Sequence, residues 1–246
     1  LAHALFERRE SVDASLWIAK TGLQAQQTRM SVISNNLANV NTIGYKKDRA
    51  VFEDLLYQNV QPAGGMTDAA TESPTGLMLG TGTRIIATEK MHSQGNIITT
   101  ENAMDVSISG DGYFSIQQTD GTLAYTRDGA FKVSSQGQLV TAGGETLTPA
   151  IVLPQNAAGI TIGRDGTVTA ELANGGGSTQ IGQLQLNRFI NNAGLSPMGR
   201  NLYRESTASG PPIVSLPGAD GAGMLMQGSL EASNVNVVEE MVSMIE

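Results

Sequence analysis

The stretch SLWIAKTGLQAQQTRMSVISNNLANVN, residues 15–41, decides the fold because its apolar side chains recur every seven positions. Two such rows, offset by three, supply the apolar residues that we expect at an interface: Leu16, Leu23, Met30, Leu37, Ile33 and Val40. This spacing predicts a long helix with a narrow apolar seam. Because packing supplies most of the stability of such a helix, the seam predicts partner helices. Gly44 is expected to end the helix as a C-terminal glycine, at a turn or hinge.

The last residues of the chain, SNVNVVEEMVSMIE at 233–246, repeat the helical pattern. The apolar positions are spaced by three, four and three residues, at Val235, Val238, Val242 and Ile245. Asn236 is expected to cap this helix at its N-terminus, with Glu239 three residues later. The pattern covers about three turns, a length at which an isolated helix is marginal in water.

The two ends of the chain differ in charge, although the protein as a whole has a net charge of −8. Between residues 15 and 49 there are five bases and one acid, whereas residues 229–246 contain four glutamates and no base. This asymmetry is either chance or a mutual attraction of the ends. The acidic balance also argues against nucleic acid as the main partner.

The middle of the chain changes character twice. Residues 59–82 are rich in Gly, Pro, Thr and Ser, which predicts a long loop or an extended linker. From Arg84 to about Gln227, turn dipeptides separate short alternating runs, which predicts antiparallel hairpins in a meander. These dipeptides are Asp111-Gly112, Asp120-Gly121, Asp128-Gly129, Gln136-Gly137, Gly143-Gly144 and Asp165-Gly166.

These segments predict an α+β fold that is mainly β. We expect an antiparallel β-rich central domain, with N- and C-terminal helices that form a coiled coil and a long extended linker. The expected domains are a leader at 1–14, terminal helices at 15–44 and 229–246, a linker at 45–84 and the β-rich domain at 85–228.

Residues able to carry out chemistry are few. The chain has no cysteine, which excludes disulfides and thiolate metal sites, and its only histidines are His3 and His92. We expect His92 to be a surface or turn histidine, and the Asp-Gly pairs to be turns rather than calcium ligands. No catalytic motif is present, so we expect no enzyme activity, cofactor or metal. No apolar run approaches the ~20 residues of a membrane span, so we expect no membrane insertion.

Both ends of the chain resemble the signatures of bacterial flagellar rod and hook proteins. The resemblance rests on Asn-Asn-Leu-Ala-Asn at 35–39 followed by Thr-Ile-Gly-Tyr at 42–45, and on SLEASNVNVVEEMVSMI at 229–245. The runs YTRDGAF and GQLVTAGG are similar to the β region of that family. The family's members begin only a few residues before this SLW, and their last helix continues past Glu246. The resemblance therefore implies that residues 1–14 lie outside the family pattern and that the last helix is truncated here.

The resemblance implies a self-assembling structural subunit of the distal rod, the shaft that transmits torque from the motor to the hook. The implied partners are further copies of the chain and the proximal rod, hook and ring proteins. The implied location is the periplasmic part of the flagellar basal body, reached by export without a cleavable signal peptide. The linker is expected to become ordered only between subunits.

Asparagines crowd the end of the first helix, and we expect Asn35, Asn36 and Asn39 to set the register between neighbouring subunits. Each amide offers two donors and an acceptor oxygen to a neighbouring chain. Capping and fraying of the helix end is the simpler explanation. Replacing Asn36 and Asn39 by Ala should stabilise the isolated helix, and undisturbed assembly of that variant would refute the register hypothesis.

Three alternatives remain open from the sequence. The nearest is the hook or another axial protein of the rod. A different class is a β-rich module that binds cell wall or carbohydrate and is raised on a helical stalk. A wall-degrading hydrolase ranks third, because no specific pair of carboxylates is evident.

Overall fold

The computed structural model describes residues 2–61, 66–68, 71–72, 75–173 and 177–245. The chain divides into two compact units. The first, which we call the helix–ribbon unit, comprises Leu1–Asn35, Asp48–Glu89 and Met241–Glu246. The second, the β unit, comprises Asn36–Lys47 and Lys90–Glu240. Strands predominate and a helix lies near each end of the chain, which confirms the prediction of a mainly β α+β fold.

The first helix, α1 (Ala2–Ala38), is a single long helix, as the heptad spacing predicts. It ends earlier than predicted, because residues 39–44 form turns. Gly44 therefore does not end the helix; it lies six residues beyond it, with a φ of +69° that favours glycine. Gly44 lies in a turn, and the expectation that it ends the helix is wrong.

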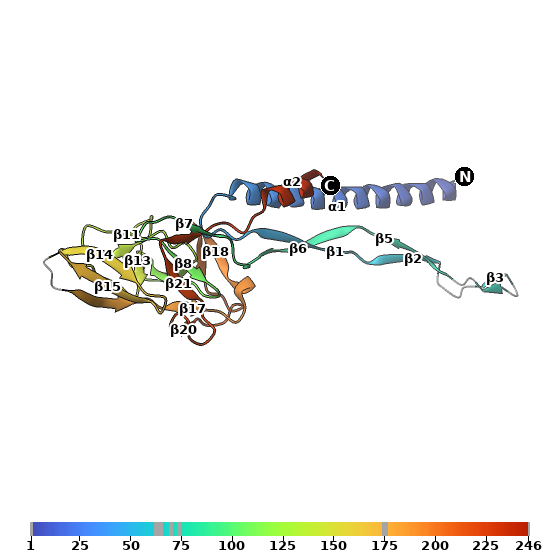
Figure 1. Ribbon diagram of the computed structural model, residues 1–246. Helices are drawn as coiled ribbons and strands as arrows, with labels where there is room; N and C mark the ends of the chain where they lie inside the picture. Colours follow the sequence, from blue (N-terminus) through green and yellow to red (C-terminus); the bar gives the residue numbers. More distant parts are fainter. Residues whose placement is uncertain (1, 62–65, 69–70, 73–74, 174–176, 246) are drawn as a thin grey trace. The chain divides into compact units, whose positions relative to one another are not determined.

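A two-stranded ribbon runs beside α1 within the helix–ribbon unit (Figure 1). Its strands pair as β1 (Asp48–Asp54) with β6 (Thr83–Lys90), β2 (Tyr57–Gln61) with β5 (Leu77–Gly80), and β3 (Met66–Asp68) with β4 (Thr71–Glu72). The chain at 59–82 was predicted to be a loop or an extended linker. Within it, the described residues of β2 and β5 pair in antiparallel register, so the expectation of a loop is wrong there.

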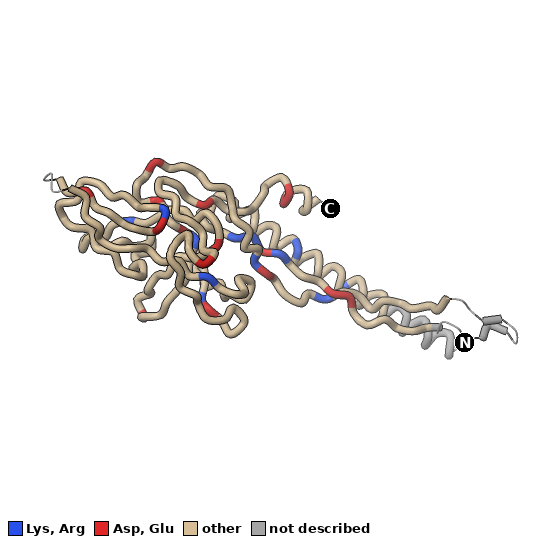
Figure 2. Tube along the Cα trace, turned by 60° about the horizontal axis from the view of Figure 1, so that its bottom comes forward, with Lys and Arg blue, Asp and Glu red and all other residues tan. Residues whose placement is uncertain are grey.

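Glycine lets the ribbon approach the helix. A Cβ at Gly82 would collide with the side chain of Thr21 on α1. Charged side chains of the ribbon gather on β1 and β6, whereas β2 and β5 carry none (Figure 2). Two ion pairs cross from β1 to β6, between Arg49 and Glu89 and between Glu53 and Arg84.

The largest sheet of the β unit has seven strands in the order β11-β12-β13-β9-β10-β19-β18. They are β9 (Phe114–Gln117), β10 (Leu123–Thr126), β11 (Lys132–Val133), β12 (Leu139–Val140), β13 (Thr146–Thr148), β18 (Ser196–Gly199) and β19 (Leu202–Arg204). Dipeptides at Asp120, Gln136 and Gly143 form hairpins of this sheet, as predicted. The order is not a simple meander, because β13 returns to pair with β9.

Smaller sheets complete the β unit. They combine β14 (Ala157–Ile162), β15 (Thr167–Leu172) and β16 (Ser178–Gln183); β17 (Leu186–Arg188) and β20 (Ile213–Ser215); β8 (Val106–Ser109) and β21 (Met224–Gln227); and β7 (Ile97–Thr99) and β22 (Ser229–Glu231). A short 3-10 helix, η1, spans Asn192–Gly194. Asp165-Gly166 forms the β14–β15 hairpin, whereas the dipeptides at Asp111 and Asp128 do not join paired strands.

The larger of the two apolar clusters found among the described residues lies inside the β unit. Its fully buried members include Phe114, Ile116, Val168, Leu186 and Leu225, which come from four different strands. The aromatic residues of the runs GYFSI and DGAFK, Tyr113, Phe114 and Phe131, are buried in this unit.

The last helix, α2 (Val237–Ile245), begins where the sequence predicts. The side-chain oxygen of Asn236 accepts a hydrogen bond from the backbone N–H of Val238, at 3.0 Å. Asn236 is therefore the N-cap, and its side chain satisfies one of the donors that every helix start leaves open.

Candidate assembly interface

The apolar seam of α1 is uncovered over most of its length. Leu16, Leu23 and Met30 are 62%, 72% and 48% exposed, whereas Ile33 is 6% exposed. Leu37 and Val40, the last members of the two rows, are half-buried. Large apolar side chains in a row at heptad spacing are the pattern that packs against another helix. The exposed part of the seam is thus a surface of about two helical heptads that lacks a cover in the single chain.

The apolar positions of the short helix α2 are likewise partly buried and partly exposed. Val235, just before the helix, is buried, while Val238, Val242 and Ile245 are 70%, 51% and 85% exposed. The three exposed positions follow helical spacing and share one face. The predicted apolar stripe of this helix is therefore also open to solvent.

The ribbon carries a third set of exposed apolar side chains, which the sequence analysis did not identify. They are Leu56, Tyr57, Val60, Leu77, Met78, Leu79 and Ile86. Most of them lie in β2 and β5, which carry no charged residue. The signal in the sequence is this uncharged, apolar composition of two segments that pair as strands. Large exposed apolar surfaces of this kind mark interaction sites.

The ends of the chain are joined inside the β unit by a group of contacts that we call the clasp. It links residues 43–47 with residues 231–240. The ammonium group of Lys46 lies 2.5 Å from a carboxylate oxygen of Glu231 and donates to the carbonyl of Ser93 at 2.8 Å. The backbone N–H of Gly44 donates to the carbonyl of Glu231 at 2.8 Å.

A second part of the clasp surrounds Lys47. Its backbone N–H donates to the side-chain oxygen of Asn234 at 2.8 Å, and its ammonium group lies 3.6 Å from Glu239 and 3.9 Å from Glu240. Lys46 and Lys47 thus meet three of the four C-terminal glutamates. Of the two explanations for the charge asymmetry, these contacts favour an attraction between the ends.

Burial sets the electrostatics of the clasp. Burial lowers the pKa of Lys46, and the charge of Arg127 acts in the same direction, while the carboxylate of Glu231 raises it. Arg127 lies 3.5 Å from Glu231 and stacks over the ring of Tyr113, 5.4 Å from its centroid. A buried ion pair of this kind fixes geometry more than it adds stability.

The asparagines at the helix end have different surroundings. Asn36 is buried, and its amide donates to Glu240 at 3.2 Å and accepts from the hydroxyl of Tyr45 at 3.2 Å. Asn39 is half-buried and accepts from the hydroxyl of Thr42 at 3.2 Å, while Asn35 is exposed on α1. The amide of Asn36 therefore serves the clasp, and a role of these residues in subunit register stays a prediction.

His92 is half-buried rather than on the surface, which corrects the expectation for this residue. It lies between β6 and β7, and its Nδ1 is 2.7 Å from the hydroxyl of Tyr113. Its ring contacts Tyr113 and Tyr203 edge to face. Packing among aromatic rings explains why His92 is half-buried.

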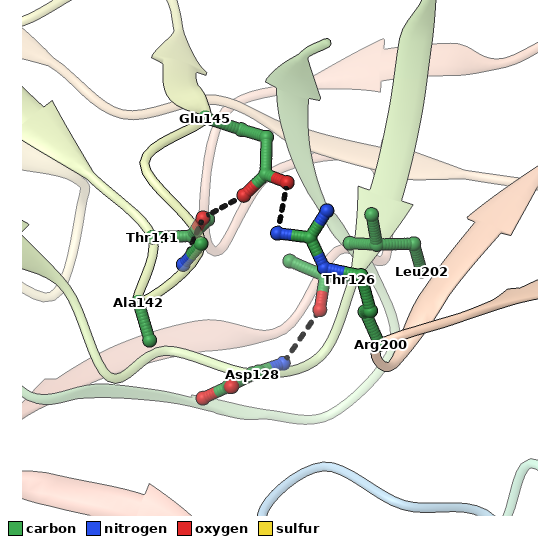
Figure 3. Close-up of a pocket in the computed structure, with 8 residues that line it drawn as sticks. Thr126, Asp128, Thr141, Ala142, Glu145, Arg200 and Leu202 are labelled. Atoms are coloured by element: carbon green, nitrogen blue, oxygen red, sulfur yellow. Dashed lines mark hydrogen bonds and ion pairs between the residues drawn. The ribbon is translucent and has the colours of Figure 1, made fainter.

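The β unit contains a pocket of about 290 Å³ in which Glu145 is paired with Thr141 and Arg200 (Figure 3). Glu145 accepts from Thr141 and lies 2.6 Å from Arg200. Burial would raise the pKa of Glu145, but these partners outweigh it and the pKa is lowered. Asp128, on another wall, has a pKa that burial raises. The pairing of its charged groups gives this pocket a structural role between neighbouring turns.

Within the described ranges, no group of His, Asp and Glu side chains is arranged to hold a metal ion. Among the same residues, no helix combines the length and the apolar character needed to cross a membrane.

Three family profiles match the chain in the order of its segments. "Flagella basal body rod protein" matches residues 16–46, "Flagellar hook protein FlgE/F/G D1 domain" matches 107–170, and "Flagellar basal body rod FlgEFG protein C-terminal" matches 226–246. The first contains residues 43–46 of the clasp, and the third contains residues 231–240.

Similarity to individual proteins extends along nearly the whole chain. The flagellar basal-body rod protein FlgG of Buchnera aphidicola subsp. Schizaphis graminum is 52% identical, over 94% of this chain and 89% of the relative. The chain belongs to the FlgG family of flagellar basal-body rod proteins. FlgG of Borreliella burgdorferi is 46% identical over 94% of this chain and 88% of its own length. The flagellar hook protein FlgE of Helicobacter pylori is 44% identical over 53% of this chain and only 18% of its own length.

FlgG membership confirms the resemblance found in the sequence. This FlgG-family chain is a structural subunit of the distal rod in the flagellar basal body. The clasp and the uncovered helical seams are therefore features of a rod subunit.

Proposed function

We propose that the chain assembles with copies of itself through the uncovered seams of α1 and α2. The observation that carries this proposal is the exposure of Leu16, Leu23 and Met30 in one heptad row. Burying apolar surface contributes roughly 25 cal/mol per Å², so each leucine of such a row is worth about 1.5–3 kcal/mol when a neighbouring helix covers it. A helical polymer repeats this gain along its whole length.

We propose further that this polymer transmits torque from the motor to the hook, and that it lies in the periplasm. The proposed partners are further copies of the chain and the proximal rod, hook and ring proteins. Export without a cleavable signal peptide belongs to the same proposal. Neither nucleic acid nor membrane insertion is part of it, since the chain is acidic and carries no spanning helix among its described residues. The proposed role is mechanical and involves no catalysis or cofactor.

The ribbon and the asparagines have proposed roles in the polymer. The exposed apolar residues of β2 and β5 support a role of the ribbon as packing between subunits. Shortening the ribbon is then expected to change the straightness or stiffness of the rod. Asn35, Asn36 and Asn39, at and just after the end of α1, are proposed to fix the register between neighbouring copies.

The test replaces Leu23 by Glu and compares it with Ile190→Glu. Both side chains are highly exposed, at 72% and 82%, but Ile190 lies in the β unit and not on the seam. We expect both variants to keep the circular dichroism of the parent protein. We expect Leu23→Glu to abolish self-association in sedimentation velocity and fibre formation in electron microscopy, and Ile190→Glu to leave both intact. Unimpaired assembly of Leu23→Glu would refute the proposal.

A further inference from the structure

The centre of the clasp has more buried positive charge than negative charge. Lys46, Arg127 and Glu231 are 0%, 3% and 1% exposed. Within the described part of the chain, Glu231 is the one carboxylate that forms an ion pair with either cation. A buried charge without a counter-ion is strongly unfavourable, so this single carboxylate has two cations to compensate.

These three residues come from distant parts of the chain. Lys46 follows α1, Arg127 follows β10, and Glu231 ends β22, close to the C-terminus. Glu231 also accepts from the backbone N–H of Gly95 at 2.9 Å, and its own carbonyl accepts from Gly44 at 2.8 Å. The site where residues 43–47 dock is thus completed by Glu231, which lies 185 positions after Lys46 in the chain.

We propose that Glu231 is a latch: residues 43–47, which follow α1, dock on the β unit only after the C-terminal segment has delivered this carboxylate. Before that, docking would bring the ammonium of Lys46 beside the guanidinium of Arg127 with no anion between them. The lowered pKa of Lys46 agrees with this arrangement, because burial and Arg127 both disfavour its charge. The latch acts within one chain and goes beyond the assembly proposed above.

If Glu231 is a latch, removing Lys46 and removing the charge of Glu231 have unequal effects on stability. Removing Lys46 leaves Arg127 and Glu231 in balance, and Glu231 keeps the N–H of Gly95. The carbonyl of Ser93 also keeps a donor, because Asn234 donates to it at 3.2 Å. Removing the charge of Glu231 leaves two uncompensated cations. An ordinary ion pair would predict similar losses from either side.

The test measures amide hydrogen exchange and thermal midpoints for Glu231→Gln, Lys46→Met and the double variant, in the full chain. Glu239→Gln is the matched control, because Glu239 is exposed and contacts Lys47 instead. For Glu231→Gln we expect exchange at residues 43–47 and 93–96 to rise at least about tenfold, with strands β9 and β10 unchanged. We expect Lys46→Met to stay near the parent and the double variant to lie between the two.

Equal damage from Lys46→Met and Glu231→Gln would overturn the latch, as would unchanged exchange at residues 43–47 in Glu231→Gln. If Glu231→Gln fails to fold, the double variant decides the question. Restored folding on addition of Lys46→Met supports two cations competing for one carboxylate, and a double variant that stays unfolded contradicts it. These measurements use the monomer, so they are independent of the Leu23→Glu assembly test.

Discussion

The side-chain amide of Asn36 lies 3.2 Å from a carboxylate oxygen of Glu240, although 204 positions separate the two residues in the chain. The other end of the same amide accepts from the hydroxyl of Tyr45. Asn36 therefore connects the end of α1, the turn that follows it and the start of α2 through one planar group. Both contacts are buried, where hydrogen bonds are costly to leave unmade.

Replacing Asn36 by Ala is expected to destabilise the protein by about 1–3 kcal/mol, because buried Glu240 and Tyr45 would each lose a partner. The expectation from the sequence, that this substitution together with Asn39→Ala stabilises the isolated helix, concerns α1 without these two partners. Urea unfolding of the monomer provides the measurement. Asn41→Ala is the control, since Asn41 is exposed, and it should change the free energy of unfolding by less than about 0.5 kcal/mol. Equal effects of the two substitutions would show that the amide of Asn36 contributes nothing.

Replacing Gly44 by Ala is expected to be more damaging than replacing Gly144. Both glycines have positive φ, at +69° and +88°, so both substitutions cost about 1–2 kcal/mol in backbone strain. A Cβ at Gly44 would also lie 2.8 Å from the backbone nitrogen of Asp128, whereas a Cβ at Gly144 meets nothing within 4 Å. The thermal midpoint of Gly44→Ala should therefore fall further. Similar midpoints for the two variants would mean that the turn at Gly44 moves away from Asp128 without loss.

Asp128 and Asp165 should make stability depend on pH in opposite directions: Asp128 stabilises the protein more at low pH, and Asp165 stabilises it more at neutral pH. Burial raises the pKa of Asp128, so its favourable contribution is present at low pH and lost as the pH rises through the raised pKa. A hydrogen bond from Thr167 lowers the pKa of Asp165, so its contribution is present at neutral pH and lost as the pH falls through the lowered pKa.

Asp128→Asn is therefore expected to raise the thermal midpoint at about pH 7 and to have a smaller effect at about pH 3. The amide can still accept the hydrogen bond from Ala130. Asp165→Asn, the control of opposite sign, is expected to lower the midpoint at neutral pH. A loss of stability in Asp128→Asn that is the same at both pH values would contradict the assignment of buried charge.

The ion pairs of the ribbon are expected to contribute little. Glu53 and Glu89 pair with arginines whose side chains are more than half exposed. Exposed pairs of this kind contribute about 0.2–1 kcal/mol, and salt screens them. Glu53→Gln and Glu89→Gln should each change the free energy of unfolding within that range, with the difference shrinking in high salt. A larger effect that survives in high salt would point to a contact other than the exposed ion pair.

Local patterns in the sequence predicted several elements correctly. Heptad spacing predicted α1, Asn236 predicted the start of α2, and four of the six turn dipeptides join paired strands. Each of these signals depends on residues a few positions apart. Helix periodicity and turn conformations are properties of such short segments, so a single sequence contains the information.

Only the tertiary structure decided which distant segments meet. The order of the seven-stranded sheet, the pairing of the ribbon, and the placement of Asn36 against Glu240 all depend on residues far apart in the chain. The sequence by itself showed that the ends carry opposite charge and that the helices have seams. It did not show that Lys46 would be fully buried beside Glu231, because nothing in a lysine's immediate neighbours determines its burial. That outcome depends on Glu231, which is 185 positions away in the chain and lies beside Lys46 only in the folded protein.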